Sequence, residues 1–194
     1  MDNVEEVELA AWGELEAAAA SPESGFRYVN LCSVDAENLP QARMVVLRRT
    51  DVTKRMLELH TDTRSAKWRE FGAHPYATLL GYCSQTRLQL RLQGTVELHA
   101  PGSSVAETAW EMLPARTRAT YAGGPPGDEL ALATNEKPSA SKPVNDADGK
   151  LHFGVLAFRA GILDWFQLRR EGNRRARFTY DPAGVVMASE WINP

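Results

Sequence analysis

The sequence has little cysteine, no excess of basic residues and no long apolar run. Its 194 residues include two cysteines, Cys32 and Cys83, without CxxC spacing, so we expect reduced, packed thiols rather than a disulfide framework. No apolar stretch has the length of a membrane span, and the acidic N-terminal segment lacks the basic start of a secretory signal. We therefore expect a cytoplasmic protein without membrane association.

The charge balance and the histidines narrow the possible partners. Lys and Arg number 22 against 25 Asp and Glu, and a net charge of −3 argues against general nucleic-acid binding. The four histidines have no ligand-like spacing, so we expect no metal site. The remaining composition, 43% hydrophobic and 24% charged, is typical of one globular domain over residues 1–194.

Hydrophobic periodicity predicts a mainly β chain with a few helices. Residues 3–20 have apolar side chains at helical spacing, and 63–73 and 104–113 read as shorter helices, the latter extending to 120 in a longer alternative. Residues 122–150 form a long, weakly patterned loop. The expected strands cover residues 26–35, 42–50, 55–61, 76–83, 87–99, 152–160, 162–169, 175–181 and 184–192.

The connections between these strands favour one fold class. They are short turns rather than regular crossover helices, which indicates an antiparallel barrel (α+β, mainly β) rather than a doubly wound sheet. Within 87–99, leucines alternate with polar residues, so one face should lie in the core. Gly94 interrupts this run and predicts a bulge or a close backbone approach.

The segment HTDTRSAK, residues 60–67, joins an expected strand to an expected helix. Asp62 or Thr63 is placed to cap the helix, and Arg64 and Lys67 are three residues apart on one helical face. Cations in a first helical turn oppose the helix dipole, so an anion such as phosphate would offset their cost. A solvated basic turn without a ligand is the alternative that these residues leave open.

The preceding strand adds a second feature of a ligand site. Arg43, Val45 and Leu47 share one face of the strand, and Met44, Val46 and Arg48 share the other. Arginines near both ends of an apolar strand suit a ligand with a charged tail and a flat apolar body.

Several ordered motifs together resemble the pyridoxamine 5′-phosphate oxidase family of FMN-binding split barrels. They are QARMVVLR at 41–48, HTDxRSxK at 60–67, LQLRLQG at 88–94, ILDWFQL at 162–168, RxRF at 175–178 and the closing WINP. The resemblance covers roughly residues 25–120 and 151–194. It implies a split β-barrel of antiparallel Greek-key strands, a homodimer with FMN at its interface, and oxidoreductase chemistry on a small molecule.

The resemblance also implies site residues. Gln89 would reach FMN from the partner chain, and the C-terminal arginine would be Arg177, with Arg175 as the alternative. Gln89 as an exposed strand residue, Trp165 as a core residue and a solvated arginine-rich hairpin remain open. The implied cofactor-binding residues are Arg43, Met44, Val45, Val46, Leu47, Thr61, Arg64, Ser65, Lys67, Gln89, Trp165 and Arg177.

The sequence departs from the oxidase pattern where that family binds its substrate. Asn173 and Arg175 stand in place of an Arg-x-His pair, and Arg48 stands where the oxidase has a lysine. We therefore expect a substrate other than pyridoxamine phosphate, with Arg48 and Arg175 as candidate binding residues. No catalytic base is evident, and His60 is expected to be structural. A non-catalytic flavin carrier or stress-related protein is one alternative, and a barrel that binds haem or a deazaflavin is another.

Overall fold

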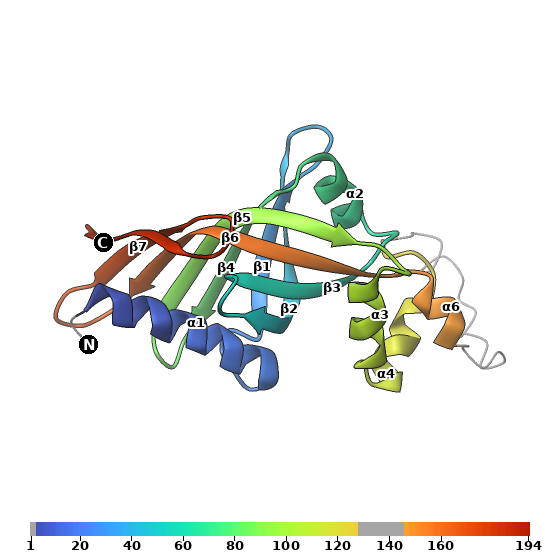
Figure 1. Cartoon of the computed structure of the whole chain (residues 1–194), viewed down its shortest axis with the longest axis horizontal. Coiled ribbons are helices and arrows are strands. Elements are labelled where there is room, and N and C mark those ends of the chain that lie inside the picture. The colour runs from blue at the N-terminus through green and yellow to red at the C-terminus, as the bar shows by residue number, and fades with distance from the viewer. Residues whose placement is uncertain (1–2, 128–145) are drawn as a thin grey trace.

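The computed structural model describes residues 3–127 and 146–194. At its centre is a barrel of antiparallel strands in the order β3-β2-β1-β4-β5-β6, closed by the pairing of β3 with β6 (Figure 1). Two further strands, β7 and β8, extend the sheet beyond β6. The expected mainly β split barrel with flanking helices is confirmed.

The strands follow the predicted order with small shifts at their ends. They are β1 (Tyr28–Val34), β2 (Pro40–Asp51), β3 (Met56–Asp62), β4 (Tyr76–Cys83), β5 (Leu88–His99), β6 (Phe153–Gln167), β7 (Arg174–Tyr180) and β8 (Val186–Ile192). The helical elements are α1 (Val4–Ala20), α2 (Ala66–Ala73), α3 (Ser104–Glu111), α4 (Ala115–Arg118), the 3₁₀ turn η1 (Ala119–Tyr121) and α6 (Asp146–Lys150).

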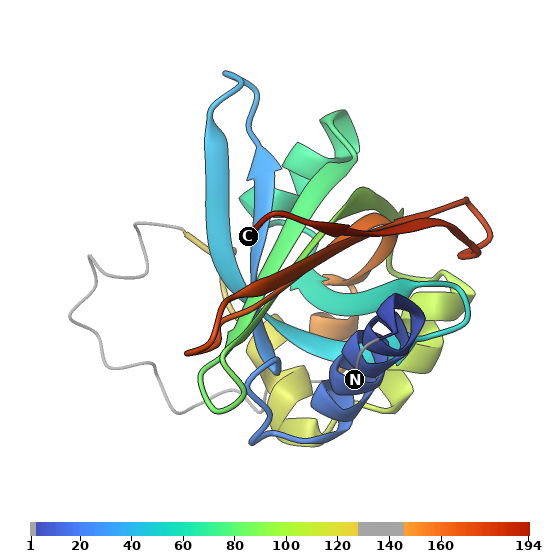
Figure 2. The same cartoon turned by 90° about the vertical axis from the view of Figure 1, so that its left-hand side faces the viewer.

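Two hydrophobic cores hold the elements together. The main core fills the barrel and includes the apolar face of α1, which packs against β2 and β8 (Figure 2). In β5 the alternation is as predicted, because Leu88, Leu90 and Leu92 are buried. A second core around Trp110, Tyr121 and Phe153 joins α3 and η1 to the start of β6. Figure 1 shows α3, α4 and α6 gathered at one end of the molecule.

The predicted break between strands 152–160 and 162–169 is wrong, because β6 is continuous from Phe153 to Gln167. Gln93 pairs with Ile162 and Gly94 with Ala160, so Gly161 is an extra residue in a bulge. Gly161, which separates the two expected strands, is therefore a bulge within a single strand. The prediction for Gly94 is confirmed: a Cβ there would lie 1.9 Å from the carbonyl oxygen of Arg159.

Three helix predictions also need correction. The helix expected over 63–73 begins at Ala66, and Ser65, rather than Asp62 or Thr63, is its N-cap. The extension of 104–113 to residue 120 is wrong, because α3 ends at Glu111 and Pro114 precedes a separate short helix. Part of the expected loop 122–150 is helical, since α6 covers Asp146–Lys150; residues 128–145 lie outside the described residues.

Candidate functional site

Strands β2 and β3 separate part-way along their length. Their ladder runs from Asp51–Met56 to Leu47–Leu59 and stops there. Beyond it, the first half of β2 pairs only with β1, and the end of β3 pairs only with β6. One edge of β2 is thus left without a strand partner in the described chain, beside the point where β3 leads into α2. Such an edge offers backbone N–H and C=O groups to a ligand.

Three predicted side chains meet where β3 leads into α2. The Lys67 Nζ donates to Thr61 Oγ1 over 3.1 Å, and that oxygen lies 3.2 Å from Ser65 Oγ. Thr61 and Ser65 are buried, and the Ser65 hydroxyl makes no capping bond to α2. The first-turn N–H groups therefore have no side-chain cap from Ser65 and can receive an anion.

Arg43 adds positive charge to this group, which we call the α2 corner: Arg43, Thr61, Ser65 and Lys67. Burial lowers the pKa of Lys67, and the charge of Arg43 lowers it further. Two cations thus lie close enough to repel each other. Arg43 is held by Glu70, at 2.8 Å from Nη2 to Oε2, and by the hydroxyl of Ser33, which also donates to Glu70.

Arg64 lies apart from the α2 corner. It precedes α2, so it does not share a helical face with Lys67 as predicted. Its guanidinium binds Asp62, with Nη2–Oδ2 at 2.6 Å and Nε–Oδ1 at 3.0 Å, and also donates to the carbonyl of Tyr121. Burial alone would raise the pKa of Asp62, but the hydrogen bonds from Arg64 outweigh it and lower that pKa. Without a ligand, Arg64 already has an anionic partner.

The outer face of the sheet carries Gln89 and Arg177 but not Trp165. Gln89 pairs with Phe166, and Asp164 pairs with Arg177, so these four side chains share one face. Trp165 points the opposite way, is 6% exposed, and packs edge-to-face on the Trp191 ring. The aromatic side chain of β6 that shares the face of Gln89 is therefore Phe166.

A buried carboxylate joins three strands on this outer face. Asp164 is 2% exposed and receives Arg91 Nη2 at 2.6 Å, Arg175 Nε at 2.9 Å and Arg175 Nη2 at 2.7 Å. Burial would raise the pKa of Asp164, but the bonds from Arg175 and Arg91 outweigh it and lower the pKa. Arg175, a predicted substrate residue, is thus oriented by an internal anion.

Comparisons with known proteins identify relatives in sequence and in fold. A family model described as pyridoxamine 5′-phosphate oxidase, FMN-binding domain, matches residues 9–100. Pyridoxine/pyridoxamine 5′-phosphate oxidase 2 of Arabidopsis thaliana is 25% identical across 96% of this chain and 98% of its own. A pyridoxamine 5′-phosphate oxidase-related, FMN-binding protein from Nostoc punctiforme superposes with a TM-score of 0.75 at 25% identity, covering 95% of this chain and 96% of that one. The chain thus resembles the pyridoxamine 5′-phosphate oxidase-like split barrels in sequence and in fold, with a family match over slightly less than half of its length.

Similarity to other relatives is partial. The pyridoxine/pyridoxamine 5′-phosphate oxidase of Caulobacter vibrioides is 38% identical, over 46% of this chain and 38% of its own length. The chain thus matches well under half of that relative. The likeness to that relative is confined to the aligned segment.

The part of β2 that the sequence predicts to lie beside the flavin has two distinct faces. Val45 and Leu47 are buried in the core, whereas Met44 is 58% exposed and Val46 is half-buried on the outer face. Leu47 pairs with Leu59 and Arg49 with Glu58, so Arg48 is the extra residue of a bulge. A bulge redirects the side chain at that position, and Arg48 accordingly lines a cleft beside α3.

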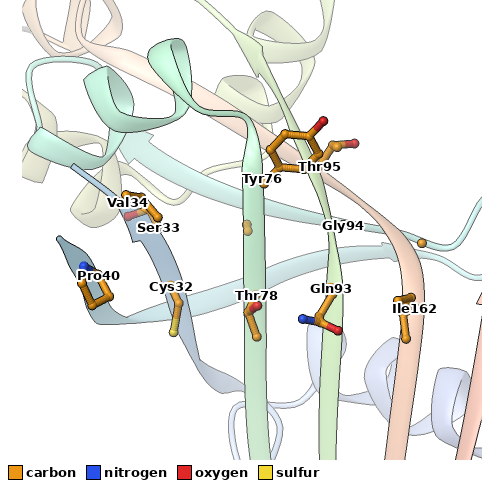
Figure 3. A pocket seen from close by; sticks show the side chains of 12 residues that line it. Cys32, Ser33, Val34, Pro40, Tyr76, Thr78, Gln93, Gly94, Thr95 and Ile162 are labelled. Atoms are coloured by element: carbon orange, nitrogen blue, oxygen red, sulfur yellow. The ribbon is translucent and has the colours of Figure 1, made fainter. Parts of the chain in front are cut away.

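Another groove lies over the outer face of β1, β4, β5 and β6 (Figure 3). Its volume is about 540 Å³, and its lining is neutral, with Cys32, Pro40, Tyr76 and Ile162 among the side chains. It contains none of the predicted cofactor or substrate residues. An uncharged groove of this kind suits packing against another protein surface better than binding an anion.

Residues 3–127 and 146–194 offer neither a group of metal ligands nor a helix that could cross a membrane. That part of the chain contains no group of three or more potential metal-ligating side chains. Nor does any helix there have the length and hydropathy needed to cross a bilayer.

Sequence reasoning missed Phe166, Asp164 and Arg91. The alternation in residues 88–93 is clear enough to place Arg91 on the face of Gln89. The register of β6 against β5 was hidden, however, by the expected break at Gly161. Without that register, the face of Trp165 and the meeting of Asp164 with two arginines were not accessible.

Proposed function

We propose that this chain is an FMN-dependent oxidoreductase that acts on a small molecule as a homodimer. The observation that carries the proposal is the α2 corner, where Lys67, Thr61 and Ser65 meet beside Arg43 at an uncapped helix start. A terminal monophosphate matches these donors in charge and size. When bound, FMN supplies two-electron transfer chemistry that no amino-acid side chain provides.

The chain's own residues bind and orient the cofactor in this proposal. Lys67, Thr61, Ser65 and the first-turn N–H groups of α2 hold the phosphate, and Arg43 adds a second cation. Residues Met44–Leu47 present the free edge of β2 to the ring system. Arg64 joins the phosphate only by exchanging its bonds to Asp62, so its contribution is smaller than that of Lys67.

The homodimer follows from the outer face of the sheet. Tyr28, Met44, Tyr76 and Tyr82 are all exposed there, at 48–74% of their surface, and Tyr76 lines the neutral groove of Figure 3. A cluster of this kind is typical of a surface that a second protein covers. Gln89 and Arg177 lie on the same face, so a second copy packed there would bring them toward its partner's cofactor. Phe166, rather than Trp165, accompanies them.

Removal of Lys67 tests the cofactor site. In Lys67→Ala we expect the dissociation constant for FMN to rise about tenfold or more, because a charge-assisted bond contributes about 1.5–3 kcal/mol. The control is Lys54→Ala, a largely exposed lysine whose ion pair with Asp51 spans 3.9 Å. Quenching of flavin fluorescence on titration measures both constants. Equal affinities of the two variants would show that the phosphate lies elsewhere.

Turnover separates an enzyme from the non-catalytic flavin-binding alternative. The FMN-loaded protein is mixed anaerobically with candidate reductants, including NADH and NADPH, and the flavin absorbance is followed. Bleaching by one donor and recovery on admitting oxygen support catalysis. Bound FMN that no donor reduces faster than it reduces free FMN supports a carrier.

A further inference from the structure

The cleft beside α3 has one charged wall and one apolar wall. It lies between the β2–β3 hairpin and α3, at the helical end of the molecule in Figure 1, and its volume is about 490 Å³. Ligand pockets for small molecules commonly enclose about 300–1,000 Å³. The strand side contributes Arg27, Arg48, Arg49, Glu58 and His60. The helix side contributes mainly apolar atoms, including Val105, Ala109, Met112 and Leu113. We call this space the α3 cleft.

Positive charge in the α3 cleft is not balanced. Arg48 makes no hydrogen bond or ion pair with any residue in 3–127 or 146–194, and the carboxylate that lines the cleft, Glu58, pairs with Arg49 and His60. Arg27 donates to the carbonyls of Ala18 and Leu47, which accept bonds but carry no net charge. Burial lowers the pKa of Arg27, and the nearby charge of Arg48 lowers it further. An anion between the two guanidinium groups would relieve this repulsion.

The same cleft is lined by a second side chain, His60, that has a polar atom without a hydrogen-bond partner in the described chain. The His60 side chain is 6% exposed, and its Nε2 lies 2.9 Å from Glu58 Oε1. Its Nδ1 is buried and has no hydrogen-bond partner in the described chain. A buried polar atom without a partner costs about 1–3 kcal/mol, which a ligand can offset. With Nε2 donating to Glu58, Nδ1 is an acceptor and suits a hydroxyl or N–H group.

We propose that the α3 cleft binds the substrate of the flavin reaction, and that this substrate is a small organic carboxylate with an apolar ring and a hydroxyl or N–H group. Arg48 binds the carboxylate, the α3 wall covers the ring, and His60 accepts the polar hydrogen. The inference rests on the proposed function, because Arg48 directly follows Met44–Leu47, the segment of β2 that we propose to lie along the cofactor. The unpaired guanidinium of Arg48 can bind a carboxylate in a bidentate way, and phosphate, which the same group can also bind, is therefore one arm of the test.

Ligand binding to the FMN-loaded protein tests this inference. The probe is 4-hydroxybenzoate, and its neutral counterpart is 4-hydroxybenzyl alcohol; inorganic phosphate is the third arm. Saturation-transfer NMR and calorimetry measure binding to wild type, Arg48→Met and Arg159→Met. Arg159 is the matched control, since it is an arginine of β6 that does not line the α3 cleft and bonds to the carbonyl of Pro182.

We expect 4-hydroxybenzoate to bind wild type and Arg159→Met alike, and to bind Arg48→Met about tenfold or more weakly. The alcohol should bind all three weakly. In His60→Phe, which keeps a ring against Phe153, 4-hydroxybenzoate should lose more affinity than benzoate. Equal affinity in wild type and Arg48→Met, or preference for inorganic phosphate, would overturn the inference.

Flavin absorbance in the same samples keeps the two proposals apart. If wild type fails to retain FMN, the proposed function fails. If every variant retains FMN but the affinity for 4-hydroxybenzoate does not depend on Arg48, only the assignment of the α3 cleft fails. A folding defect is recognised because Arg48→Met would then lose FMN together with the probe.

Discussion

Asp164→Asn removes the charge that holds Arg91 and Arg175 together without changing the shape of the side chain. The carboxylate is 2% exposed and accepts bonds of 2.6, 2.7 and 2.9 Å from the two arginines. The asparagine keeps one acceptor oxygen and turns an NH₂ group toward a guanidinium. Hydrogen bonds to charged groups contribute about 1.5–3 kcal/mol each and are not additive. Both arginines are partly exposed, so we expect a loss of about 2–4 kcal/mol.

Unfolding of the cofactor-free protein measures this loss. For a chain of this size, each kcal/mol lowers Tm by about 2–4 °C, which predicts a fall of about 4–16 °C. Glu190→Gln is the matched control, because Glu190 is an exposed carboxylate on the same sheet face, opposite Arg177 in the register of β7 and β8. Its effect should stay within about 0.5 kcal/mol. If Asp164→Asn lost no more stability than Glu190→Gln at the same protein concentration, the buried ion cluster would not stabilise the sheet.

The pH dependence of this difference has a defined sign. The folded-state pKa of Asp164 is lowered, so the carboxylate stabilises the fold fully above its unfolded pKa of about 3.9. The stabilisation is lost as pH falls through the lower, folded-state pKa. The stability gap between wild type and Asp164→Asn should therefore be constant from neutral pH to about pH 4 and shrink only below it.

Two further predictions concern the anchoring of α1 and the proposed dimer. Tyr180→Phe should lower stability by about 1–3 kcal/mol in urea unfolding, because the buried hydroxyl accepts from Trp12 Nε1 at 2.9 Å and donates to Glu8 Oε1 at 2.8 Å; unchanged stability would mean that water replaces the hydroxyl. Light scattering should give twice the 21.5 kDa chain mass, and Met44→Asp with Tyr76→Asp should shift the particle toward the monomer. A wild-type mass of 21.5 kDa would contradict the dimer.

The sequence was sufficient where one local rule decided the structure. Leu88, Leu90 and Leu92 predicted the core face of β5 because alternation has the same meaning in every antiparallel sheet. Gly94 predicted a close approach because a strand interior seldom tolerates a glycine without such a reason. The antiparallel barrel followed from the short turns between strands, which leave no room for regular crossover helices.

Prediction failed where the outcome depended on a partner distant in sequence. The expected strands 152–160 and 162–169 left a break at Gly161, but β6 pairs with β5 on both sides of this residue, so Gly161 is a bulge inside one strand. That bulge sets which face receives Trp165, and motif matching contains no information about faces. Arg64 and Lys67 looked equivalent by spacing, yet Asp62 takes one of them. Local spacing identifies candidate ligand-binding residues, whereas the ion pairs and hydrogen bonds formed in the fold decide which of these side chains stay available to a ligand.

Such ion pairs also explain how the α2 corner holds like charges without a ligand. Arg43 and Lys67 lie close enough to repel each other, and the carboxylate of Glu70 pairs with Arg43, as that of Asp62 does with Arg64 outside the corner. Within residues 3–127 and 146–194, Lys67 donates only to a neutral hydroxyl oxygen, that of Thr61, and its pKa is lowered. The residual positive charge therefore centres on Lys67. A phosphate entering the corner should meet Lys67 first, while the arginines bind it only as far as they leave their carboxylates. This is why Lys67→Ala, rather than Arg64→Ala, is the decisive substitution for cofactor binding.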